Sequence, residues 1–181
     1  MKVDEQEIII MALESEAPNM SKWDNIFFTG IGKVNATMLL TELLVNYPGV
    51  TKVWNFGTAG GITVDSGIHR CTKFVQRDMH CEPMGYETGQ TPWEEEIEIV
   101  TAKDGLICSS GDNFVTNPND LLLGDIVDME AYALAKVCQR MGVKFECWKY
   151  ISDSANDDSP DAWRENVSKG EEEFIRIFNN G

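Results

Sequence analysis

The segment Trp148-Lys149-Tyr150-Ile151-Ser152-Asp153-Ser154 begins as an apolar strand and ends abruptly in small and acidic residues. In an α/β protein this pattern puts Asp153 at the carboxyl end of a strand, where open parallel sheets bind their ligands. A carboxylic acid held there beside apolar neighbours is able to donate a proton near neutral pH. The alternative is that Asp153 only caps the next turn, and this segment alone leaves both interpretations open.

The rest of the chain alternates between strand-like and helical segments, which predicts an α/β fold. We expect one domain over residues 1–181, with a mixed, mainly parallel central sheet flanked by helices. A long polar loop at 77–95 is a candidate binding loop, because it is too long for a simple connection. The expected strands are 7–13, 26–28, 52–56, 69–76, 96–100, 105–109 and 144–151, and the expected helices are 33–46, one from Met129 to Gly142, and one from Ser159 onward.

The first and last of these helices carry apolar residues at helical spacing, which indicates faces that pack on the sheet. Ser159 and Pro160 supply the cap and first-turn residue typical of a helix start. The residues expected to face the core are Val34, Met38, Leu39, Leu43 and Leu44 in the first helix, and Trp163, Val167, Phe174, Ile177 and Phe178 in the last.

Composition excludes several classes of function. The formal net charge of −15, with no basic run, argues against binding to nucleic acid or to anionic membranes. No apolar run approaches the roughly 20 residues that span a bilayer. The N-terminal residues are too acidic and polar for a secretory signal, so we expect a cytoplasmic protein.

The five cysteines show no short paired spacing, so we expect buried, reduced thiols. His80 and Cys81 are adjacent, but zinc spacings such as CxxC or HExxH are absent from the sequence. We therefore expect neither a metal nor a cofactor.

Several motifs are ambiguous when taken singly. The turns Gly30-Ile31-Gly32 and Gly57-Thr58-Ala59-Gly60-Gly61 lack P-loop and GxGxxG spacing, so each is either a structural turn or a place where backbone approaches a ligand. Glu130 suits the first turn of a helix through the helix dipole alone. Phe114 is either a core residue or a ring that stacks on a flat heterocycle.

Taken together and in this order, the motifs resemble those of the nucleoside phosphorylase/nucleosidase superfamily. The branch they resemble most is that of the methylthioadenosine/S-adenosylhomocysteine nucleosidases. The resemblance covers nearly the whole chain and implies a phosphorylase/hydrolase-like fold. The segments that carry it are 12–16 (ALESE), 30–36 (GIGKVNA), 55–61 (NFGTAGG), 85–90 (GYETGQ), 110–115 (SGDNFV), 128–131 (DMEA) and 151–153 (ISD).

The resemblance implies hydrolysis of the N-glycosidic bond of adenine nucleosides, through two catalytic carboxylates. The family's acid, matched by Asp153, protonates N7 of the departing purine, and the family's base, matched by Glu16, activates water. The sugar carbon then develops oxocarbenium character, as in other glycoside hydrolyses. The residues implied in substrate binding are Glu130 at the ribose hydroxyls, Met129 against the sugar, Phe114 and Val115 at the base, Ser152 beside Asp153, and Leu13, Thr58, Ala59, Gly60, Tyr86 and Lys149 elsewhere around the ligand.

The chain departs from the family pattern in three ways. Lys149 stands where arginine is usual, which keeps the charge and loses the planar two-pronged donor. Leu13 stands where methionine is common. The chain is also shorter than a typical member, with length missing between the first strand and Gly30 and again between 62 and 69. We therefore expect an altered pocket for the 5′ substituent.

Three other functions are alternatives to nucleoside hydrolysis. A purine nucleoside phosphorylase would bind phosphate with several arginines; Glu16 would repel that dianion, so hydrolysis is favoured. A purine-nucleoside binding protein without activity would be expected to lose Asp153 or Glu16, and both are present. A dinucleotide oxidoreductase lacks its GxGxxG fingerprint here.

The family resemblance also implies a homodimer in which the loop 77–95 reaches the ligand of the neighbouring subunit. This loop carries Met84, Tyr86, Pro92 and Trp93. The alternative is a loop that packs on its own subunit.

Overall fold

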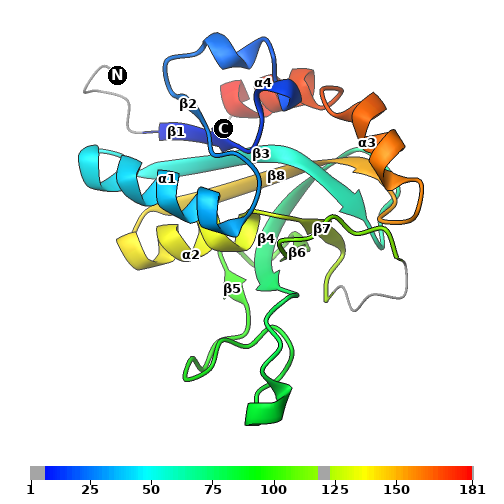
Figure 1. The fold of residues 1–181 in the computed structure, drawn as a ribbon. Helices are drawn as coiled ribbons and strands as arrows, with labels where there is room; N and C mark the ends of the chain where they lie inside the picture. The colour runs from blue at the N-terminus through cyan, green and yellow to red at the C-terminus, as the bar shows by residue number, and fades with distance from the viewer. Residues whose placement is uncertain (1–6, 118–122, 181) are drawn as a thin grey trace.

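The computed structural model describes residues 7–117 and 123–180, which form one eight-stranded sheet with helices on its two faces (Figure 1). The strands are β1 (Glu7–Met11), β2 (Ile26–Phe28), β3 (Lys52–Gly61), β4 (Ile68–Gln76), β5 (Ile99–Val100), β6 (Leu106–Ser110), β7 (Ile126–Asp128) and β8 (Lys144–Asp153). The helices are α1 (Lys33–Asn46), α2 (Ala131–Met141), α3 (Ser159–Asn166) and α4 (Glu171–Asn180), with short 3₁₀ turns at Glu14–Glu16, Met20–Lys22 and Glu82–Met84.

Five of the strands pair in a closed ring, in the order β3, β7, β6, β4, β8 and back to β3. β1 and β2 extend the sheet from β3, and β5 pairs only with β4 among the described strands. The carboxyl ends of β3 and β8 lie next to each other, because these two strands pair in parallel along their whole length.

The prediction of a mixed sheet is confirmed, but antiparallel pairs have a larger share than in the mainly parallel sheet that was expected. β3 with β7, β4 with β5, and β4 with β8 are antiparallel pairs. Parallel neighbours need a long crossover, usually a helix. The connection 62–67 is too short for one, so the chain reverses direction between β3 and β4.

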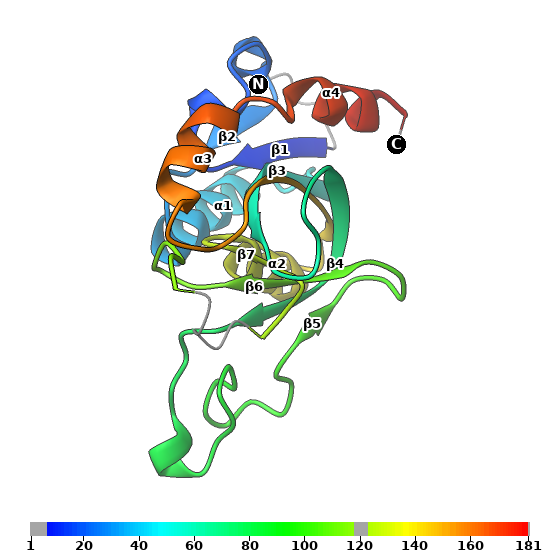
Figure 2. The ribbon, with the colours of Figure 1, turned by 90° about the vertical axis from the view of Figure 1, so that its right-hand side faces the viewer.

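The sheet is apolar on both faces. In β1, Ile8 and Ile10 pack in a core under α1 and α2, while Ile9 and Met11 pack in a second core with Phe174 of α4. This alternation follows from the two-residue period of a strand. Figures 1 and 2 show α1 and α2 together on one side of β1 and β3, with α3 and α4 on the other.

Two expectations about the helices are corrected. The bounds of α1 are as predicted, but Val34 and Met38 are 72% and 68% exposed, and the buried face carries Ala36 and Leu40 instead. The helix expected from Ser159 onward is two helices. It is interrupted near Gly170, where a Cβ would lie 2.6 Å from the Cβ of Tyr150, so the chain packs there directly on β8.

Within residues 7–117 and 123–180, the search for a helix long and apolar enough to cross a membrane finds none.

Candidate active site

A cavity of about 410 Å³ lies at the carboxyl ends of β3 and β8. Its walls come from loops and strand ends that are far apart in the sequence, as expected for a site at a sheet edge. The predicted site residues among its lining are Leu13, Glu16, Thr58, Ala59, Gly60, Phe114, Val115, Met129, Glu130, Ser152 and Asp153. The lining residues that were not predicted are Ala12, Ile31, Arg77, Asn113, Thr116, Val127, Asp128, Pro160, Trp163 and Arg164.

Asp153 ends β8, and hydrogen bonds hold both of its carboxylate oxygens. Ser152 Oγ lies 2.9 Å from Oδ2, and the backbone N–H of Ala155 donates to Oδ1 over 3.0 Å. A Cβ at Gly60 would lie 2.9 Å from Asp153 Oδ1. Gly60 therefore gives this carboxylate room to approach β3.

Glu16 lies in the 3₁₀ turn after β1 and is 3% exposed. Its Oε1 accepts the backbone N–H of Thr58 at 2.8 Å and the Thr58 hydroxyl at 3.0 Å. Its Oε2 accepts the backbone N–H of Leu13 at 3.0 Å. Glu16 and Asp153 line the same cavity, so one ligand can reach both carboxylates.

The glycines at 57–61 were expected in a turn, and the structure has them in strand β3. Close approach of side chains explains them. A Cβ at Gly57 would lie 3.2 Å from Glu16 Oε1 and 3.3 Å from Lys149 Nζ. By contrast, Gly30 and Gly32 do form a turn, with φ of 77° and 98°, which favours glycine.

Glu130 precedes α2 and faces the same cavity. Its Oε1 accepts the backbone N–H of Gly32 at 2.8 Å. Burial, together with the nearby negative charge of Asp128, raises the pKa of Glu130 to about 7. The ionisation of this side chain therefore changes across the neutral range.

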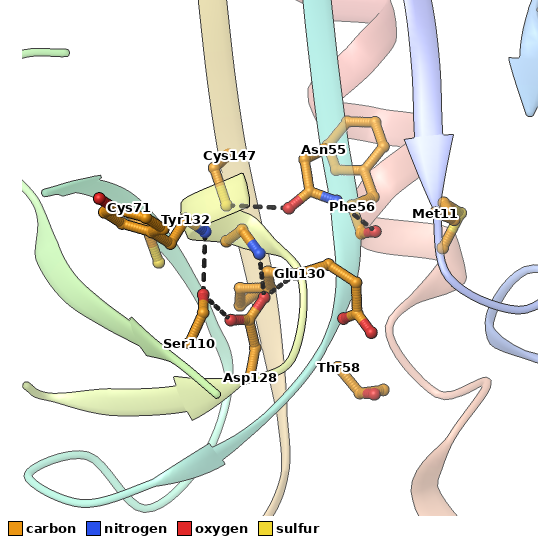
Figure 3. Close-up of polar contacts among 12 residues, drawn as sticks. Met11, Asn55, Phe56, Thr58, Cys71, Ser110, Asp128, Glu130, Tyr132 and Cys147 are labelled. Carbon is orange, nitrogen blue, oxygen red and sulfur yellow. Dashed lines mark hydrogen bonds and ion pairs between the residues drawn. The ribbon is translucent and has the colours of Figure 1, made fainter. Parts of the chain in front are cut away.

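Asp128 and Lys149 form an ion pair inside the ring of strands, with Asp128 Oδ2 2.9 Å from Lys149 Nζ. Asp128 also accepts a hydrogen bond from the Ser110 hydroxyl (Figure 3). The backbone N–H of Ala131 donates to Asp128 Oδ2. Burial opposes the charge on Asp128, but Lys149 and these donors outweigh it and lower the pKa of Asp128. Burial also disfavours the charged form of Lys149, but the negative charge of Asp128 outweighs burial and keeps the pKa of Lys149 above its usual value.

Lys149 was expected around the ligand, beside Glu16 and Thr58. The structure does not bring it into the cavity lining, and its partner is Asp128. Lysine here supplies a buried positive charge to Asp128 on β7.

Phe114 and Val115 belong to the loop after β6, which Arg77 holds in place. Arg77 Nη1 donates to the Asn113 side chain and Nη2 to the Asn113 carbonyl, each at 2.8 Å. A Cβ at Gly111 would lie 1.7 Å from Arg77 Nη1, so glycine is required there. Phe114 stays 42% exposed and can meet a ligand, whereas Val115 is buried.

Trp163 was predicted to face the core, and the structure has it in the cavity wall. Its Nε1 donates to Thr58 Oγ1 at 3.1 Å, and its ring meets that of Phe114 edge-on at 6.5 Å. The sequence signal for this residue is an aromatic side chain in the first helix after Asp153. Helical spacing alone does not separate a face that packs in the core from one that lines a cavity.

Tyr86, a predicted binding residue, is not among the residues that line the cavity. It packs near Trp93, with ring centroids 6.1 Å apart, on the loop 77–95. Figures 1 and 2 show this loop, the lower green segment, extending away from the sheet.

Comparison with known proteins matches residues 25–179 to the phosphorylase superfamily. The 5'-methylthioadenosine/S-adenosylhomocysteine nucleosidase of Shewanella halifaxensis is 31% identical over 170 residues, which cover 78% of this chain and 73% of that protein. The protein of the same name from Shewanella denitrificans is 33% identical and covers 73% and 69%.

Two solved structures show the same fold. A futalosine hydrolase mutant of Helicobacter pylori superposes with a TM-score of 0.82 at 21% identity, covering 92% of this chain and 94% of that one. The Streptococcus pneumoniae MTA/SAH nucleosidase with 8-aminoadenine gives 0.81 at 18% identity, covering 96% of each chain. By its sequence, this chain belongs to the phosphorylase superfamily and, within it, to the family of the 5'-methylthioadenosine/S-adenosylhomocysteine nucleosidases.

Proposed function

We propose that this protein hydrolyses the N-glycosidic bond of adenine nucleosides such as 5′-methylthioadenosine and S-adenosylhomocysteine, releasing adenine and a ribose derivative. The observation that carries the proposal is that Asp153, Glu16 and Glu130 line one cavity. The names of the sequence relatives support the substrate class.

Asp153 acts as the general acid at the base end of the ligand. It protonates N7 of the purine, which makes the base a better leaving group. Phe114 stacks on the base and the Val115 backbone contacts its edge. The hydrogen bond between Ser152 and Asp153 supports this role, because it fixes the direction of the carboxyl group.

Glu130 binds the ribose hydroxyls while Met129 packs on the sugar. Glu16 binds and activates the attacking water as the C1′ carbon develops positive charge. Its three protein donors support this role, because they hold the carboxylate in one orientation before the substrate binds.

Phosphorolysis is the second candidate, and the charges around the cavity argue against it. Among the described residues, the cationic side chains in the lining are Arg77, which holds Asn113, and Arg164, which pairs with Asp161. A phosphate at the position of the water would face Glu16 and lose solvation without a compensating cluster of arginines.

The test is a panel of purine nucleosides assayed for free base with and without phosphate. We expect adenine release from 5′-methylthioadenosine and S-adenosylhomocysteine at the same rate in both conditions. A rate that depends on added phosphate would identify a phosphorylase. No release from any purine nucleoside, with binding retained, would identify a binding protein.

We also propose a homodimer in which the loop 77–95 reaches the neighbouring subunit's ligand. Trp93 and Met84 on this loop are 83% and 58% exposed, an arrangement that favours burial against a partner. The cytoplasmic location stays a prediction of the sequence.

A further inference from the structure

The carboxylate of Glu16 has few acceptor positions left. A carboxylate offers about four lone-pair sites, two on each oxygen. The Thr58 N–H and hydroxyl occupy Oε1, and the Leu13 N–H occupies one site of Oε2. Counting the hydrogen bonds of the described residues, one position on Oε2 is left for water.

The hydroxyl of Thr58 has only one hydrogen to give, and Trp163 decides where that hydrogen goes. An indole N–H is a donor and never an acceptor. Trp163 Nε1 lies 3.1 Å from Thr58 Oγ1, so Thr58 accepts there. Its own hydrogen then points to Glu16 Oε1 at 3.0 Å, because the carboxylate is the acceptor on that side.

We infer that Trp163 is a positioning residue for hydrolysis, which acts on Glu16 through Thr58. The indole N–H takes one of the two acceptor sites of the Thr58 hydroxyl, so the single hydrogen of that hydroxyl cannot point toward Trp163 and stays directed to Glu16. Thr58 then holds Oε1, and the attacking water is directed to the remaining position on Oε2. This inference rests on the proposed function, since it assigns Glu16 the role of water base.

The placement of Trp163 supports a role beyond filling space. Its ring meets Phe114, which is expected to stack on the base, and its N–H contacts Thr58, which holds the proposed water base Glu16. One side chain therefore contacts both parts of the site. A change at Trp163 that removes only the N–H therefore tests the connection to Thr58 while an aromatic ring stays beside Phe114.

The deciding experiment is a double-mutant cycle between Trp163→Phe and Thr58→Val, with Thr58→Ser as the matched control that keeps a hydroxyl. Trp163→Phe should lower kcat about three- to tenfold in the wild-type and Thr58→Ser backgrounds, the effect of one lost hydrogen bond. In the Thr58→Val background it should lower kcat less than about twofold, because valine has already removed the hydroxyl that connects Trp163 to Glu16.

Equal losses of kcat in all three backgrounds would overturn the inference, because Trp163 would then act by packing. A rise in KM with unchanged kcat would also overturn it, because Trp163 would then be only a wall for the substrate. If wild type releases no adenine from any nucleoside, the proposed function fails instead, so the two failures are distinct.

A second measurement does not depend on activity. The chain has five tryptophans, and the indole N–H proton resonance that disappears in Trp163→Phe identifies Trp163. Thr58→Val should shift that resonance and speed its exchange with solvent, whereas Thr58→Ser should leave it near its original position. An unchanged resonance in Thr58→Val would overturn the hydrogen bond on which the inference depends.

Discussion

At the scale of single residues, the proposed acid is the most direct point to test. Asp153→Asn keeps the size of the side chain and removes the proton that would go to the base. We expect it to bind adenine nucleosides but to lose about 10²–10⁴ in kcat, the usual contribution of one general acid. Stopped assays of adenine release, with binding measured by calorimetry, check this. Near-normal turnover would exclude Asp153 as the acid.

Glu130 should bring opposite effects on stability and on binding. Its folded pKa of about 7 exceeds its ordinary value of 4.5, so the folded protein retains a proton there in the window from about 4.5 to 7. The stability associated with that proton is present below about pH 4.5 and is lost as pH rises through 7. Glu130→Gln should therefore stabilise the protein at pH 8, by on the order of 1–3 kcal/mol.

Thermal unfolding of wild type and Glu130→Gln between pH 5 and pH 8 measures that difference, which should shrink toward pH 5. The same variant should bind ribosides less tightly than wild type at pH 8, because it offers no charged acceptor to the ribose hydroxyls. Binding of free adenine serves as the control and should change little. A stability gain that does not vary with pH would contradict this account.

The family resemblance named about half of the residues that line the cavity, but it could not supply their partners across the fold. Glu16 and Thr58 were both recognised from the family resemblance, yet their hydrogen bond depends on the packing of the β1 turn against β3. Lys149 was expected near the ligand because its sequence position matches a family residue. Its pairing with Asp128 depends on β7 and β8 belonging to the same ring of strands, which no local pattern predicts.

At the scale of elements, the loss of one partner of the ion pair between Lys149 on β8 and Asp128 on β7 should destabilise this part of the sheet. Lys149→Met would leave Asp128 buried without its counter-charge, which typically costs about 3–5 kcal/mol. We expect a lower urea midpoint of unfolding.

Adding Asp128→Asn to that variant removes the uncompensated charge and should recover part of the loss. A single variant with the wild-type midpoint would show that Ser110 and the Ala131 N–H suffice for Asp128.

Local sequence predicted the elements better than their arrangement. The bounds of α1 were recovered because Pro48 and Gly49 follow closely after its last apolar residues. The division of the last helix was not predicted, because Gly170 is required by its contact with Tyr150, which is distant in the sequence. The exposure of Val34 and Met38 could not be predicted for a related reason. The spacing of apolar residues defines an apolar face of the helix, but the packing of neighbouring elements decides which face is buried.

At the scale of the whole molecule, exposed apolar side chains on the loop 77–95 predict association. Replacing Trp93 and Met84 together by serine should shift a homodimer toward monomer and raise KM, because the loop would no longer complete the neighbouring site. Light scattering after size exclusion measures the mass, and Met141→Ser, at a residue 43% exposed at the end of α2, is the matched control. A wild-type chain that stays monomeric at high concentration would contradict the dimer.

The prediction of a single unit over residues 1–181 stays a prediction, and the alternation of strands and helices could not reveal that the strands close on themselves. Ring closure depends on β4 meeting β8 and β7 meeting β3 at long sequence separation. Hydrophobic periodicity reports which residues are buried, but not which strands become neighbours.

Ring closure has one consequence for behaviour in crowded solution. A sheet is most vulnerable to uncontrolled polymerisation where a strand offers unpaired backbone groups along its border. Here the described strands with a single neighbour are β2 and β5, which contain three and two residues. The long strands β3 and β8 have partner strands on both sides. Their backbone groups are therefore unavailable as templates for the addition of further strands in a fibre.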